Sequence, residues 1–108
     1  MPSTYKVLGQ EAPAATTLTT LYTVPAGKSA VCSTLTICNR GNGTKFRVAV
    51  SPGGVAVENK HYIVYDGSLS ANDSTFLTLG ISLAESDVVR VYSDAAHVSF
   101  GLFGTELS

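Results

Sequence analysis

The chain has 108 residues, a formal net charge of −1 and 14% charged residues, whereas a typical domain carries about 25%. This length suits one domain, and no segment rich in lysine or arginine offers the electrostatic footprint of a nucleic-acid-binding protein. No apolar run reaches the roughly 18 residues of a membrane span, and the first residues lack the features of a signal peptide. We therefore expect no nucleic-acid partner, no membrane partner, and synthesis in a cytosol.

Residues 1–17 are predicted to form an extended N-terminal arm, because two prolines interrupt them and only Tyr5, Val7 and Leu8 are large and apolar. Three interpretations of this arm stay open: a short edge strand, a segment that packs on a neighbouring subunit, or a loosely ordered terminus. Residues 18–108 are predicted to form a single β-sandwich domain.

The segment 21–50 predicts a hairpin, with turns at 25–27 and 39–43 where glycine, proline and asparagine gather. The long strand between the turns is expected to alternate strictly. One face then carries Val31, Ser33, Leu35 and Ile37, and the other carries Cys32, Thr34, Thr36 and Cys38. In the next strand Phe46, Val48 and Val50 are expected to face one way, and Lys45, Arg47 and Ala49 the other.

The two cysteines are predicted to lie on one face of one strand, separated by six residues of extended chain, or about 20 Å. A disulfide needs Cα atoms within about 7 Å, so Cys32 and Cys38 cannot bond to each other in a regular strand. Either both thiols are buried or half-buried, or they bond between copies of the chain.

The second half of the chain continues the β pattern. We expect strands over 18–24, 61–65, 75–79, 88–92 and 98–103, a bend or bulge at Gly80, and a short polar tail at 106–108. Residues 55–60 fit either a strand stub or one helical turn. With about seven to eight strands and no sustained 3.6-residue period, the sequence predicts an all-β fold, an antiparallel β-sandwich or jelly roll.

No residue pattern indicates chemistry. His61 and His97 each open a strand and have no metal-ligating partner at a suitable spacing, so we expect both at the surface or at the rim of the sandwich. The carboxylates mostly fall in turns, no serine sits in a nucleophile elbow, and no glycine-rich loop precedes a helix. We therefore predict no enzyme activity, no catalytic residue, no metal site and no cofactor.

Aromatic side chains are the remaining candidates. Tyr62 and Tyr65 have opposite parity in a regular strand, so one of them is expected at the surface. Exposed tyrosines can stack on sugars or anchor protein interfaces, although aromatic residues are also common strand fillers.

Several segments together resemble a family of short structural proteins from tailed bacteriophages, and the likeness spans nearly the whole chain. The segments are YKVLGQ (5–10), AATT (14–17), LYTVPAGKSAV (21–31), CNRG (38–41), FRVAVSPGG (46–54), NKHYIVYD (59–66), ANDS (71–74), LTLGI (77–81), DVVRVY (87–92) and SFGLFGTE (99–106). The resemblance implies a virion component made in the host cytoplasm: a small β-sandwich subunit, homo-oligomeric (a trimer is one form), that attaches to other virion proteins. It transfers no functional residues.

Two roles are compatible with these expectations. As an accessory subunit at the capsid, neck or tail, the chain would use its arm (Tyr5, Val7, Leu8) and the outward side chains Lys45 and Arg47. As a module that binds a glycan or receptor of the host surface, it would use Tyr62, Tyr65, His97 and the turn at 39–43.

Overall fold

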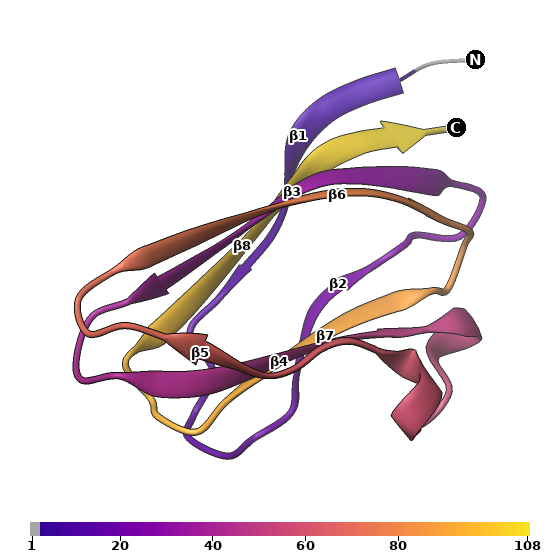
Figure 1. Cartoon of the computed structure of the whole chain (residues 1–108). Coiled ribbons are helices and arrows are strands. Elements are labelled where there is room, and N and C mark those ends of the chain that lie inside the picture. The colour runs from indigo at the N-terminus through magenta and orange to yellow at the C-terminus, as the bar shows by residue number, and fades with distance from the viewer. Residues whose placement is uncertain (1–2) are drawn as a thin grey trace.

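The computed structural model describes residues 3–108, which form eight β-strands and two short 3₁₀ turns (Figure 1). The strands are β1 (Ser3–Glu11), β2 (Thr19–Thr23), β3 (Ser29–Asn39), β4 (Thr44–Ser51), β5 (Tyr62–Leu69), β6 (Ser74–Leu83), β7 (Val88–Ser93) and β8 (Val98–Leu107). The turns η1 (Pro52–Gly54) and η2 (Asn59–His61) connect β4 to β5, which answers the open question over 55–60 in favour of a helical turn at its end.

The strands pair into two four-stranded sheets, which lie as two layers in Figure 1. The first sheet has the order β1-β8-β3-β6 and the second the order β2-β7-β4-β5, and every neighbouring pair is antiparallel. The predicted antiparallel β-sandwich of about seven to eight strands is confirmed. Within residues 3–108, no helix has the length and apolar character needed to cross a bilayer.

The core lies between the sheets, because alternation sends one side chain in two from each strand toward the opposite layer. Deeply buried aliphatic side chains from β3, β8, β4 and β7 include Leu35, Ile37, Leu102, Val48 and Val91. Across the layers, the rings of Phe46 and Phe100 approach to 6.2 Å between centroids. Both sheets therefore contribute to one continuous core.

The predicted N-terminal arm is, over residues 3–11, an edge strand of the first sheet. β1 pairs with β8 along its length, and Leu8 packs against the core. A Cβ at Gly9 would collide with the backbone carbonyl of Leu21, so only glycine allows β1 to lie this close to β2. In Figure 1 the strand ends that lead to the two termini lie side by side. Of the three interpretations, the edge strand is the one present in the isolated chain.

A β-bulge corrects the predicted alternation of β3. The register with β8 shifts between Cys32 and Thr34, which adds one residue at Ser33 and reverses every side chain that follows. Val31 is consequently on the outer face although Leu35 is buried, and Cys32 is buried although Cys38 is exposed. The two thiols lie on opposite faces of one strand, rather than on one face as predicted.

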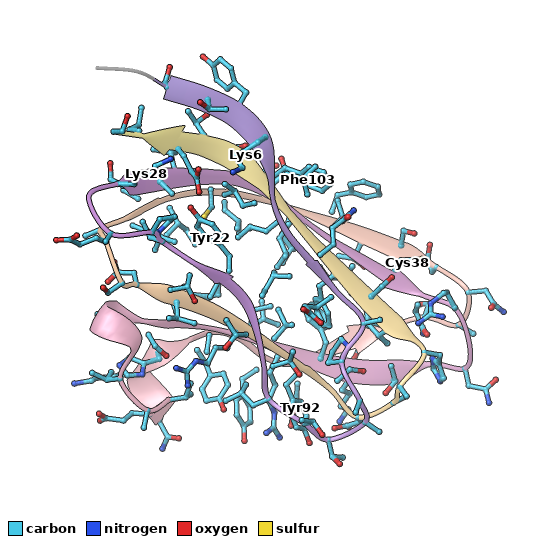
Figure 2. The ribbon with its side chains drawn as sticks, turned by 180° about the vertical axis from the view of Figure 1, so that it is seen from behind. Lys6, Tyr22, Lys28, Cys38, Tyr92 and Phe103 are labelled. Atoms are coloured by element: carbon cyan, nitrogen blue, oxygen red, sulfur yellow. The ribbon has the colours of Figure 1, made fainter. Side chains whose placement is uncertain are left out.

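The predicted polar tail is also wrong, because residues 106–107 belong to β8 and Glu106 is only 6% exposed. Its Oε2 accepts a 2.6 Å hydrogen bond from the Tyr22 hydroxyl, and its Oε1 lies 3.1 Å from Lys6 Nζ and 3.8 Å from Lys28 Nζ. Figure 2 shows the side chains of Lys6, Tyr22 and Lys28 gathered at this end of the sandwich. One carboxylate thus connects both sheets.

Candidate functional site

The seven residues predicted for an interface fall on two different sheets. Tyr5, Val7 and Leu8 belong to β1 of the first sheet, whereas Lys45, Arg47, Tyr62 and Tyr65 belong to β4 and β5 of the second. Tyr5 and Val7 are exposed, whereas Leu8, the next residue along β1, points to the opposite side and packs against the core. The structure therefore contains two candidate surfaces instead of one.

On the outer face of the second sheet, four side chains assemble around Arg47. Its guanidinium lies 4.2 Å from the ring centroid of Tyr65 and 4.6 Å from that of Tyr92, and its Nε donates a 2.7 Å hydrogen bond to Asp66. Tyr62 meets Tyr65 edge to face at 4.9 Å between centroids. We call these five residues the tyrosine–arginine cluster. The guanidinium is attracted to the faces of both aromatic rings.

Hydrogen bonding sets the charge states in this cluster. The bond from Arg47 lowers the pKa of Asp66, and the same bond raises the pKa of Arg47. Lys45 adds a second positive charge that lowers the pKa of Asp66 further. Asp66 is therefore an anion and a hydrogen-bond acceptor throughout the neutral range, fixed beside the two tyrosine rings.

Irregularities in β5 place both predicted tyrosines on the same side. The register with β4 shifts twice, and at one of these shifts Asp66 adopts a left-handed conformation with φ of 54°. Tyr62 pairs with Ala49 in the register, its ring meets the Tyr65 ring, and Tyr65 stacks on Arg47. The parity argument predicted only one of the two at the surface, and it misses the second because it assumes a regular strand.

A shallow hollow of about 470 Å³ adjoins the cluster and is lined by Asn59, Tyr62 and Tyr65. Two residues near these tyrosines were not predicted as site residues. Asn59 is in η2, a segment that the sequence analysis could not assign to a strand or a helical turn, and Tyr92 is in β7, where alternation gave no indication of function. An amide beside two tyrosine rings offers both hydrogen-bonding groups and apolar ring surface to a ligand.

The other residues proposed for glycan binding lie elsewhere and have structural roles. His97 Nδ1 lies 2.8 Å from Asn39 Oδ1, and the amide of buried Asn39 also donates to the carbonyls of Asn42 and Ser70. Ser70 follows the far end of β5, away from Tyr62, so the turn at 39–43 does not join the hollow.

His61 differs from its expected surface position, because it is buried and its Nδ1 accepts a hydrogen bond from the Glu58 backbone. Within residues 3–108, no group of three or more metal-ligating side chains comes together.

The second candidate surface is the outer face of the first sheet, which we call the uncharged face. Cross-strand pairing aligns its side chains in four rows: Tyr5, Thr105, Val31 and Ser82; Val7, Phe103, Thr34 and Thr78; Gln10, Gly101, Thr36 and Phe76; and Ser99, Cys38 and Ser74. Among the residues that the structure describes, these rows include no acidic or basic side chain. Figure 2 shows Phe103 on this side of the sandwich and Tyr92 on the opposite side.

Large apolar groups stand out from the uncharged face. Tyr5 is 85% exposed and Phe76 is 71% exposed, and both lie on edge strands of the sheet. Between them, at the β1 side, Gly101, Gln10, Thr36 and Ser99 line part of a hollow of about 340 Å³. The Thr36 hydroxyl and the Phe103 ring lie directly against Gly101, so the hollow is beside this glycine. Exposed aromatic side chains on an uncharged surface are typical of protein interaction sites.

Comparison with known proteins adds no assignment to either surface, since no family model matches the chain and no curated protein matches its sequence.

Proposed function

We propose that this chain is an accessory structural subunit of a tailed-bacteriophage virion, which acts by binding and not by catalysis. It attaches through protein–protein contacts at the capsid, neck or tail, and its partners are copies of itself and other virion proteins. The observation that carries this proposal is the uncharged face. The resemblance of the sequence to short structural proteins of tailed phages supports the kind of particle.

The surface chemistry favours a protein partner for this face. Interface centres are depleted in charge and enriched in aromatic residues, and the uncharged face has both properties through Tyr5, Phe76 and Phe103. A rigid β-sandwich holds these side chains in place before binding, which lowers the entropy lost on association.

The test is to purify phage particles on a density gradient from a lysate in which this chain is produced. We expect the chain in the particle fraction, at a copy number that matches a symmetric assembly by mass spectrometry, and at a defined position in an electron-microscopy map. A chain that is abundant in the lysate and absent from intact particles would refute the proposal.

A second candidate function is recognition of a host-surface glycan, and the hollow lined by Asn59, Tyr62 and Tyr65 favours it. A sugar ring packs on aromatic rings through its apolar face, and the amide of Asn59 would bond its hydroxyl groups. Titration with host polysaccharide tests this function. We expect Tyr65→Ala to abolish binding and Tyr5→Ala, on the other sheet, to leave it unchanged; no binding by the native chain would dismiss it.

A further inference from the structure

We propose that the uncharged face is the contact between two copies of this chain, which stack first sheet on first sheet about a two-fold axis. The inference rests on the proposed function, because it names the partner that occupies part of the proposed attachment surface.

Charge selects a second copy as the occupant. In a two-fold contact, the same surface of each copy forms the interface. A face with charges of one sign would therefore place like charges opposite each other, unless charges of both signs were paired across the contact. The four rows of the uncharged face contain no such charge, and the one carboxylate beside them, Glu11, is at the rim of the hollow. The second sheet, in contrast, has charged residues on β4, β5 and β7: Lys45, Arg47, Asp66 and Arg90. A dimer formed through the outer faces of two second sheets would have to remove these charges from water, which costs free energy.

The shape of the face is complementary to itself along the row Gln10, Gly101, Thr36 and Phe76. Phe76 projects at the β6 edge, and the hollow that Gly101 lines is two strands away, on the far side of Thr36. A two-fold axis that is parallel to β3 and passes above Thr36, between the two faces, exchanges the two sides. It brings Phe76 to the partner's hollow, beside the Phe103 ring that covers Gly101, and brings the partner's Phe76 to the same place on this copy.

The hollow has room for this ring. Its volume is about 340 Å³, whereas a cavity of about 150 Å³ is enough for benzene. Gln10, Ser99 and Thr36 supply polar groups around it, and one carboxylate, that of the exposed Glu11, lies at the end of β1 where water still reaches it. The phenyl ring therefore enters the hollow beside the Phe103 ring, which already covers Gly101.

The area agrees with a modest dimer. Four strands at about 4.8 Å spacing and an 11-residue β3 at about 3.4 Å per residue describe a face of roughly 650 Å². Two such faces bury about 1,300 Å², at the lower end of specific interfaces, so we expect a dissociation constant in the micromolar range.

Pairing between the β6 edges of two copies is the rival arrangement. β6 contains no charged residue to block it, and such edges invite pairing. However, Gly80 has a φ of 80° and the register with β3 shifts beside it, so the edge is interrupted near its middle. Stacking of the faces requires no such continuous edge.

Sedimentation velocity of the purified chain over a wide concentration range tests the proposal, with three variants. Thr36→Lys places a charge at the two-fold axis without touching the β6 edge, and Phe76→Ser removes the projecting ring. Thr20→Lys makes the matched change on the exposed outer side of β2, in the second sheet. Thermal melting confirms that each variant is folded.

We expect a monomer–dimer equilibrium in the native chain and in Thr20→Lys, and a dissociation constant at least tenfold higher in Thr36→Lys and Phe76→Ser. Alkylation of the exposed Cys38, which lies in the fourth row of the face, should slow as the dimer forms. A native chain that stays monomeric or forms trimers, or a dimer that Thr36→Lys leaves intact, would overturn the inference.

The outcomes separate this inference from the proposed function. A monomeric chain that still incorporates into particles overturns the dimer and leaves the virion role standing. If the chain forms the dimer with the expected effects of the variants but is absent from particles, the dimer is supported and the virion role is refuted.

Discussion

Replacing the buried carboxylate of Glu106 by an amide should destabilise the sandwich more than any other conservative change at a charged residue. Glu106→Gln keeps the shape of the side chain and an acceptor for the Tyr22 hydroxyl. It removes the negative charge that faces Lys6 and Lys28. The perturbation therefore isolates the electrostatic part of the connection between the two sheets.

The magnitude follows from the contacts. A hydrogen bond to a charged group contributes about 1.5–3 kcal/mol and a neutral one about 1 kcal/mol, so the Tyr22 bond weakens by about 1 kcal/mol. Each half-exposed lysine pair contributes about 0.5 kcal/mol after solvent screening. The total loss is about 2 kcal/mol, and for 108 residues with an unfolding entropy of about 0.23 kcal/mol/K it lowers Tm by about 9 °C.

The assay is thermal and urea unfolding of the native chain, Glu106→Gln and the control Glu11→Gln, which alters an exposed glutamate of β1. At pH 7 we expect the control to stay within about 0.5 kcal/mol of the native chain.

The pH dependence gives a second readout. The hydrogen bond from Tyr22, supported by Lys6 and Lys28, lowers the pKa of Glu106 below its value in the unfolded chain. Its stabilising effect is therefore complete above the unfolded pKa of about 4.3 and disappears as the pH falls through the lower folded pKa. The difference between the native chain and Glu106→Gln should narrow in that acidic range. A loss below about 0.5 kcal/mol at pH 7, or a difference that stays constant with pH, would refute the reasoning.

Three further predictions concern the backbone and the thiols. Gly104→Ala should cost about 3 kcal/mol or more in chemical unfolding, because its Cβ would collide with the Val31 carbonyl, whereas Gly43→Ala, with 3.3 Å to its nearest atom, should cost less. At position 66, whose φ is 54°, Asp66→Gly should be more stable than Asp66→Ala by about 1 kcal/mol, and equal stabilities would contradict the left-handed backbone. A thiol reagent should modify Cys38 in the folded chain and reach Cys32 only on unfolding, since burial raises the pKa of the Cys32 thiol to about 11; rapid reaction of both would exclude the bulge in β3.

Local signals were enough to predict the fold class and most of the strands, but not how the strands pair. The hairpin predicted over 21–50 does not form, because β3 and β4 belong to different sheets. Alternation in 44–51, and glycine in the left-handed conformation at Gly27 and Gly80, are properties of a few neighbouring residues. They hold whatever the rest of the chain does. Local sequence patterns could not predict the structural role of Glu106, because its partners Tyr22 and Lys6 are remote in sequence.

The sequence by itself determined that this chain is an antiparallel β-sandwich, because alternation and turn residues act over a few positions. Only the tertiary structure decided which side chains face outward. A bulge arises where a strand meets its partners, and the single residue it adds at Ser33 reverses Cys38 relative to Cys32. The uncharged face and the tyrosine–arginine cluster are likewise products of register, since each combines side chains from strands that are distant along the chain and adjacent in the sheets.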